Sequence, residues 1–198
     1  GRSLQFGPFK FNVPDMPAQE RKAQGSGVIV RSSGLIVTNN HVISGAGKIR
    51  VVLADGRDFE ATVLAKDPHT DLAALSLVKT DENRHLFLEK GFPHMRMGRG
   101  DKVEVGDAVL AIGNNLGLQN TVTQGIISCV GRIMPAKPDP RHPGSSPGPV
   151  VPTAKIAVPL IQTSASINPG SSGGALVSMA GTLVGINTMI MTPSGGNV

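Results

Sequence analysis

The sequence predicts an all-β protein, a sandwich or a barrel, and three features of its 198 residues support this class. Short apolar, β-branched runs recur between Gly, Asp and Asn residues, a spacing typical of strands joined by turns. The 25 Gly and 15 Pro favour many turns over long helices. No run of about 18 apolar residues occurs, so we expect no transmembrane segment.

The expected strands form two sets, preceded by an arm. Residues 1–24 carry Phe6, Phe9 and Phe11 without a helical period, and we expect a long irregular arm there. The first set of strands comprises Gly27–Val30, Leu35–Thr38, Ile49–Leu53, Phe59–Ala65 and Ala73–Val78. The second set comprises Ala108–Ile112, Thr121–Val130, Ile156–Gln162, Ala175–Ser178 and Leu183–Asn187. Within the first set, Asp55-Gly56 predicts a tight hairpin turn.

Other segments interrupt this pattern. Asp81–Gly100 is polar, and we expect it to link two halves of the protein. Met134–Pro152 contains seven prolines, which predicts a long surface loop. The chain opens with Gly1 and shows no signal peptide, so we expect a processed form or an excised domain.

Charge and cysteine content narrow the possible functions. The net charge is +5, but the basic residues are scattered, which favours a solvated surface over a nucleic-acid interface. The single cysteine, Cys129, cannot form an internal disulfide. It lies in an apolar run without a neighbouring His, so we expect a small buried residue rather than a thiol nucleophile.

Three separate segments carry groups that could act together. Thr38-Asn39-Asn40-His41-Val42 follows a strand, Asp67–Ala73 ends in Asp71-Leu72-Ala73, and Asn168–Gly174 contains Ser172 before two glycines. Each segment alone has a structural reading: a surface His, a turn Asp, a Gly-rich turn. A phosphate loop is disfavoured because the third segment has no Lys and no helix pattern follows it.

Taken together, these groups make up the parts of a Ser-His-Asp hydrolase. A serine hydroxyl needs a neutral imidazole to take its proton, and that imidazole needs an acceptor on its other nitrogen. We therefore predict a catalytic triad of His41, Asp71 and Ser172. Backbone N–H groups of Gly170, Ser171 and Ser172 are the candidates for an oxyanion hole.

These motifs resemble the HtrA/DegP family of chymotrypsin-like serine proteases. The likeness covers roughly residues 25–198. It rests on Gly25-Ser26-Gly27, Thr38–Val42, Asp67–Ala73, Val105-Gly106-Asp107, Ala111–Asn114, Thr123–Ser128, Ile161-Gln162-Thr163 and Gly185–Thr188. The order His, Asp, Ser and the separation of 30 positions from His41 to Asp71 also suit the family.

The resemblance implies a fold and an activity. The fold would be two antiparallel six-stranded β-barrels with the active site between them: residues 25–88 for the first and 89–198 for the second, which lacks its last strand. No PDZ module would be present in this chain. The activity would be endoproteolysis of unfolded or damaged proteins in the periplasm by a homotrimer, with no cofactor, metal or nucleic acid. The primary specificity pocket would be lined by Ile167, Asn187, Thr188, Met189 and Ile190.

The chain departs from the family pattern at several positions. Ser171 stands where the family usually has Asn, and Ser164 where it has Asp. Asn115-Leu116 replaces the usual Pro-Phe. Because Asn tolerates unusual backbone angles better than Ser, we expect a shifted oxyanion loop.

Two alternatives remain on the sequence alone. A protease-shaped binding or chaperone module without turnover would fit the departures around Ser172. An esterase would be expected to place Gly-x-Ser-x-Gly between a strand and a helix, and no helix pattern follows Gly174.

Overall fold

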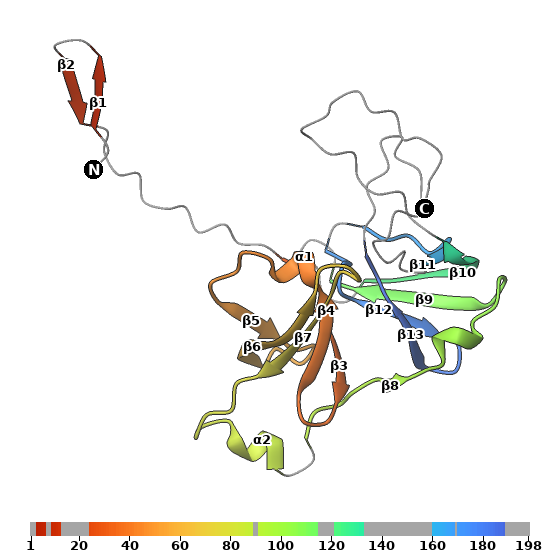
Figure 1. Ribbon diagram of the computed structural model, residues 1–198. Helices are drawn as coiled ribbons and strands as arrows, with labels where there is room; N and C mark the ends of the chain where they lie inside the picture. The colour runs from red at the N-terminus through yellow and green to blue at the C-terminus, as the bar shows by residue number, and fades with distance from the viewer. Residues whose placement is uncertain are drawn as a thin grey trace.

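The computed structural model of the chain describes residues 3–6, 9–12, 24–88, 91–114, 121–132, 160–168 and 170–188. Strands dominate these ranges and form a five-stranded sheet, a six-stranded sheet and a two-stranded hairpin (Figure 1). The predicted all-β class is thus confirmed. No helix in the described ranges is long and apolar enough to cross a membrane.

The first sheet has the strand order β3-β4-β7-β6-β5 and is antiparallel throughout. Its strands are β3 (Val28–Arg31), β4 (Leu35–Asn39), β5 (Ile49–Val52), β6 (Asp58–Asp67) and β7 (Leu72–Leu77). The β5–β6 hairpin turns at Asp55-Gly56 as predicted, since Gly56 has a positive φ and its N–H donates to the Leu53 carbonyl. A four-residue helix, α1 (Asn40–Ile43), follows β4 directly.

The second sheet has the strand order β11-β10-β9-β12-β13-β8. Its strands are β8 (Arg96–Met97), β9 (Ala108–Gly113), β10 (Thr121–Arg132), β11 (Leu160–Thr163), β12 (Ala175–Ser178) and β13 (Thr182–Ile186). All neighbours are antiparallel except β13 and β8, which pair in parallel. A single 3₁₀ turn, η1 (Gly100–Lys102), lies between β8 and β9.

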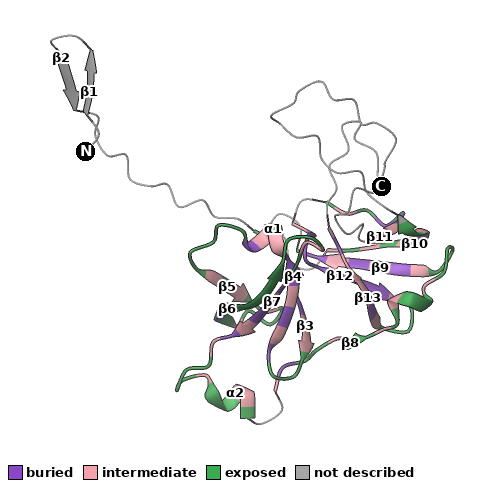
Figure 2. Cartoon of the chain, in the orientation of Figure 1, coloured by how far each residue is buried: buried purple, intermediate pink, exposed green. Residues whose placement is uncertain are grey.

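Alternating apolar residues bury one face of β4, β7 and β9, whereas β12 is buried on both faces over Ala175–Val177 (Figure 2). The first core gathers around Ile36, Leu75 and Leu77. A separate core in the second sheet contains Val109 and Ile127, which are almost fully buried. Each sheet therefore covers a core of its own.

A third core joins the two sheets. Val28 of β3 packs there with Ala175, Val177 and Leu183 of β12 and β13. Both sheets thus bury apolar surface against each other, which holds the loops at their shared edge in fixed relative positions.

The segment expected as a polar link carries structure of its own. It contains α2 (Arg84–Leu88) and β8, and Phe92 inserts into the first core. The Phe92 ring makes edge-to-face contacts with Phe59 and Phe87, at centroid distances of 5.4 and 4.9 Å. Such pairs add to the burial energy of large side chains, so this segment stabilises the first sheet as well as joining the two.

One expectation needs correction. The N-terminal arm is not wholly irregular, because β1 (Ser3–Phe6) and β2 (Phe9–Asn12) form an antiparallel hairpin that pairs Phe6 with Phe9. In the described ranges the first sheet has five strands and the second has six, and the barrels stay a prediction. The expected loop Met134–Pro152 and residues Asn115-Leu116 lie outside the described residues.

Candidate active site

His41 is presented by the junction of β4 with α1. Thr38 and Asn39 at the end of β4 are buried, so the strand is anchored up to the residue before the helix. The helix then turns the chain, and the His41 side chain is 49% exposed. A rigid strand end therefore carries an imidazole that remains accessible.

Asp71 lies in the turn between β6 and β7 and has an unusual backbone. Its φ of +55° is the only positive value at a non-glycine residue in the described ranges. The left-handed region is costly for most side chains but is tolerated by Asp and Asn. The Asn40 N–H and the Asn39 side-chain amide donate to the Asp71 carbonyl, at 2.9 and 3.1 Å. These bonds hold the strained residue against the end of β4, as strained residues at functional sites are held.

Asp67 organises the same turn from its other end. Its carboxylate accepts the His69 backbone N–H at 2.9 Å and the Thr70 hydroxyl at 3.0 Å. The hydrogen bond from His69, followed by that from Thr70, lowers the pKa of Asp67. Asp67 is exposed and thus serves the turn, while the second Asp of the segment faces His41.

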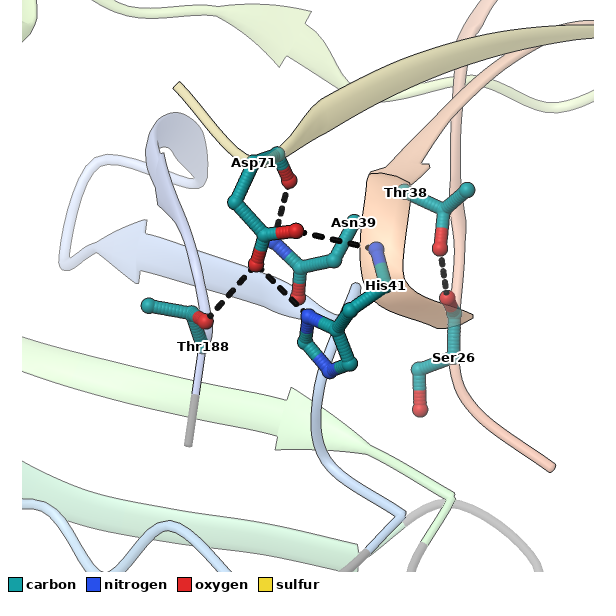
Figure 3. A network of polar contacts seen from close by, with 6 residues as sticks. All are labelled: Ser26, Thr38, Asn39, His41, Asp71 and Thr188. Carbon is teal, nitrogen blue, oxygen red and sulfur yellow. Dashed lines mark hydrogen bonds and ion pairs between the residues drawn. The ribbon is translucent and has the colours of Figure 1, made fainter. Parts of the chain in front are cut away.

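His41 and Asp71 form a two-point contact (Figure 3). The His41 backbone N–H donates to Asp71 Oδ1 at 2.9 Å, and His41 Nδ1 lies 2.6 Å from Asp71 Oδ2. Because an ionised carboxylate only accepts hydrogen bonds, this geometry puts the ring proton on Nδ1. The unprotonated Nε2 of that tautomer can accept a proton.

Thr188 completes the surroundings of the carboxylate. Its hydroxyl donates to Asp71 Oδ2 at 3.3 Å, the same oxygen that faces the His41 ring. Thr188 follows β13 of the second sheet, whereas Asp71 directly precedes β7 of the first. Segments attached to both sheets thus supply side chains that orient one carboxylate.

Ser172 lies in the loop between β11 and β12, and it is only 7% exposed. Its carbonyl accepts the Ser26 backbone N–H at 2.8 Å. The next residue, Gly173, has a φ of +87°, and a β-carbon there would overlap the Ser26 carbonyl oxygen and the Thr38 hydroxyl. Only glycine therefore fits directly after Ser172.

Ser171 does not need the backbone tolerance of Asn. Among the described non-glycine residues only Asp71 has a positive φ, so the substitution causes no strain of that kind at Ser171. The Ser171 N–H donates to the Asn168 carbonyl at 2.9 Å, which closes a turn before the candidate nucleophile. Gly170 has a φ of +98°, a value suited to glycine.

The expected pocket residues fall in different places. Ile167 is half-buried and packs against the second core. The Asn187 side chain is buried, and its amide donates to the Ile112 and Ala175 carbonyls at 3.2 and 3.0 Å. Asn187 and Thr188 thus direct their side chains to the sheet and to Asp71. Met189 and Ile190 lie outside the described residues.

Two contacts were missed from the sequence. The Thr188–Asp71 bond joins residues 117 positions apart, and no spacing rule points to it. Ser26 was noted only within the Gly25-Ser26-Gly27 motif, although its side chain reaches the nucleophile loop. No group of three or more His, Cys, Asp or Glu that could hold a metal occurs within the described ranges.

Comparisons with known proteins identify a family and several relatives. A family model described as a trypsin-like peptidase domain matches residues 25–186. A probable periplasmic serine endoprotease DegP-like of Ectopseudomonas mendocina is 38% identical over 95% of this chain and 35% of its own length. A probable periplasmic serine protease do/HhoA-like of Haemophilus influenzae is 44% identical over 87% of this chain and 32% of its own length.

Solved structures show the same relationship. The HtrA-type protease AlgW with a tripeptide aligns with a TM-score of 0.68 and 42% identity, over 88% of this chain and 49% of that chain. The chain spans about a third of the length of the curated relatives that it matches. The resemblance to HtrA/DegP proteases is confirmed, and the chain belongs to the trypsin-like peptidase domain family.

Proposed function

We propose that this chain is a serine endopeptidase domain with His41, Asp71 and Ser172 as its catalytic triad. The observation that carries the proposal is the two-point contact between Asp71 and His41, which orients the imidazole and fixes its tautomer. A His with only a surface role would not require an Asp in a strained conformation, bonded to the end of the strand that precedes the His. Such a contact is what a general base requires.

In the proposed mechanism, Nε2 of His41 takes the proton of the Ser172 hydroxyl as its oxygen attacks the peptide carbonyl. Asp71 stabilises the imidazolium that results. The imidazolium then gives its proton to the leaving amine, and an acyl-enzyme remains on Ser172. Nε2 of His41 then takes a proton from water as the water oxygen attacks the ester. The imidazolium returns that proton to the Ser172 oxygen as the carboxylic acid product leaves.

The oxyanion of the tetrahedral intermediate needs backbone donors. The Ser171 N–H already donates to Asn168 within the loop. We therefore assign the oxyanion hole to the amides of Gly170 and Ser172. The Ser171 amide would serve the turn that presents them.

The finer architecture is also part of the proposal. Residues 25–88 and 89–198 would form two barrels, the second without its last strand, with the active site between them. Support comes from the two separate cores and from the Asp71–Thr188 bond, which joins the β6–β7 turn to the segment after β13. Phe92 packs on the first core, so the start of the second unit would remain tied to the first.

Substrates and location follow from relatives. Several relatives are named periplasmic serine endoproteases, which indicates a protein-degrading role in the periplasm for this chain. We propose unfolded or damaged polypeptides as substrates and a homotrimer as the working form. Ile167, with Met189 and Ile190, would supply the apolar wall of the primary pocket.

A fluorophosphonate probe together with two substrates tests this function. The protein should be labelled at Ser172 and should cleave unfolded casein, with little action on a simple ester lacking a peptide. Labelling without casein cleavage would favour a chaperone-like module, and efficient ester hydrolysis without proteolysis would favour an esterase. Either result would contradict the proposal.

A further inference from the structure

Ser26 makes four hydrogen bonds, and two of them reach the loop of the candidate nucleophile. Its N–H donates to the Ser172 carbonyl at 2.8 Å, and its hydroxyl donates to the Gly170 carbonyl at 2.6 Å. The same hydroxyl oxygen accepts the Asn114 backbone N–H at 2.8 Å. The Ser26 carbonyl accepts the Thr38 hydroxyl at 2.6 Å (Figure 3). One residue thus holds both ends of the stretch from Gly170 to Ser172.

The hydroxyl bond acts at the point where the loop has least restraint of its own. Gly170 has no side chain, and its φ of +98° lies in a region open to glycine. Its carbonyl belongs to the same planar peptide unit as the Ser171 N–H, which donates to Asn168. Rotating this unit would break both bonds and would re-aim the amides on either side of it.

The bonds of Ser26 also relate the loop to the rest of the site. Thr38 lies in β4, three residues before His41, and Asn114 directly follows β9 of the second sheet. A single serine therefore ties the nucleophile loop to the strand that carries the imidazole and to a central strand of the other sheet.

We infer that the Ser26 hydroxyl is a positioning group for catalysis, which fixes the Gly170–Ser171 peptide so that the amides of Gly170 and Ser172 point at the developing oxyanion. This inference rests on the proposed function. Ser26 touches neither substrate nor the reacting atoms. Its effect appears in the acylation rate, because preorganised donors contribute mainly in the transition state.

Ser26→Ala removes only the hydroxyl and leaves both backbone bonds of residue 26 in place. We expect kcat on a peptide substrate to fall about tenfold or more with KM nearly unchanged, the loss typical of one well-placed hydrogen bond. The rate of fluorophosphonate labelling should fall in parallel. Ser178→Ala is a matched control, since it loses a partly buried hydroxyl that bonds Thr182 in the same sheet, away from the site. It should keep the wild-type kcat.

Ser26→Thr and Ser26→Val form a second comparison, because the two side chains are nearly equal in size and differ in the hydroxyl. The Thr variant should retain most of the kcat and the Val variant should not, at similar midpoints of chemical unfolding. A folded Ser26→Ala protein whose kcat is within twofold of the wild-type value would overturn the inference. Equal kcat losses in the Thr and Val variants, or in Ser26→Ala and Ser178→Ala, would do the same.

The experiment separates this inference from the proposed function. A wild-type protein without Ser172-dependent cleavage would refute the proposed function, whatever the Ser26 variants do. A wild-type protein with such cleavage, but with an unaffected Ser26→Ala, would refute the role of Ser26 alone.

Discussion

Asp71 holds His41 at two points, through the backbone N–H at 2.9 Å and through ring Nδ1 at 2.6 Å. The backbone contact sets the distance between the β6–β7 turn and α1, and the ring contact sets the orientation of the imidazole. Asp71 makes both contacts from an unusual backbone conformation, at φ +55°.

Asp71→Asn should lower kcat by about 10³–10⁴-fold with little change in stability. Asn tolerates the same positive φ, so the turn should persist. Its side-chain amide can donate toward Nδ1, which favours the tautomer with the proton on Nε2. Steady-state kinetics on a peptide substrate and thermal unfolding check both statements.

Asp67→Asn is the matched control for this variant. It lies in the same turn and bonds only His69 and Thr70 among the described residues. It should keep a kcat near that of the wild type. A folded Asp71→Asn protein with more than a tenth of the wild-type kcat would contradict the assigned role of Asp71.

Cleavage should follow small or medium apolar residues such as Val, Ala and Leu. None of the expected pocket residues is acidic, and Ser164 stands where the family has Asp. Half-buried Ile167 offers an apolar surface near the second core. Mass spectrometry of casein fragments gives the preference directly, and a dominant preference for Lys or Arg would refute this prediction.

The N-terminal arm should mediate trimer formation. In the β1–β2 hairpin Phe6 pairs with Phe9, and Leu4 pairs with Phe11. Burying one Phe side chain stabilises a protein by on the order of 1.5–3 kcal/mol. An arm that packs on a neighbouring subunit supplies the heterologous contact that a cyclic trimer needs. Light scattering should therefore give about three times the 20.5 kDa chain mass.

Changing Phe6, Phe9 and Phe11 together to Ala should shift the species to a monomer and weaken proteolysis. As a control, changing one exposed apolar residue, Val52 of β5, to Ala should leave the mass of the assembly unchanged. A wild-type chain that stays monomeric at tens of micromolar would rule out assembly through the arm.

Local sequence signals predicted most of the strands. Alternation as in Leu72–Leu77 and turn residues such as Asp55-Gly56 act within a few residues, so they are visible without the fold. The packing of Phe92 against Phe59 and Phe87 was missed, because it depends on how a segment taken for a link returns to the first core. The hairpin at β1–β2 was missed because two four-residue strands give too short an alternation.

In the candidate site, too, local motifs were predicted and contacts between distant segments were not. His41 and Asp71 were predicted from their motifs, and the structure brings their side chains together. The place of Thr188 in the pocket stays a prediction, and its hydroxyl bond to Asp71 was not foreseen. The hydrogen bond from Ser26 to Gly170 joins residues 144 positions apart. It depends on how the two sheets pack together, which no local pattern encodes.

The triad should act as one unit. Ser172→Ala and His41→Ala should each lower kcat by about 10⁵-fold or more, and the double variant should lose little beyond either single change. Both variants should unfold at the wild-type midpoint, since His41 is half exposed and Ser172→Ala removes one small polar group. Additive losses would show that the two residues do not share one catalytic step.

Casein proteolysis by Ser172→Ala beside Ser171→Ala tests whether Ser172 is the nucleophile. The two serines are adjacent and both buried, so the pair separates the nucleophile from its neighbour under matched conditions. We predict that Ser172→Ala is inactive, whereas Ser171→Ala still cleaves casein. An active Ser172→Ala protein, with activity lost in Ser171→Ala, would contradict this prediction.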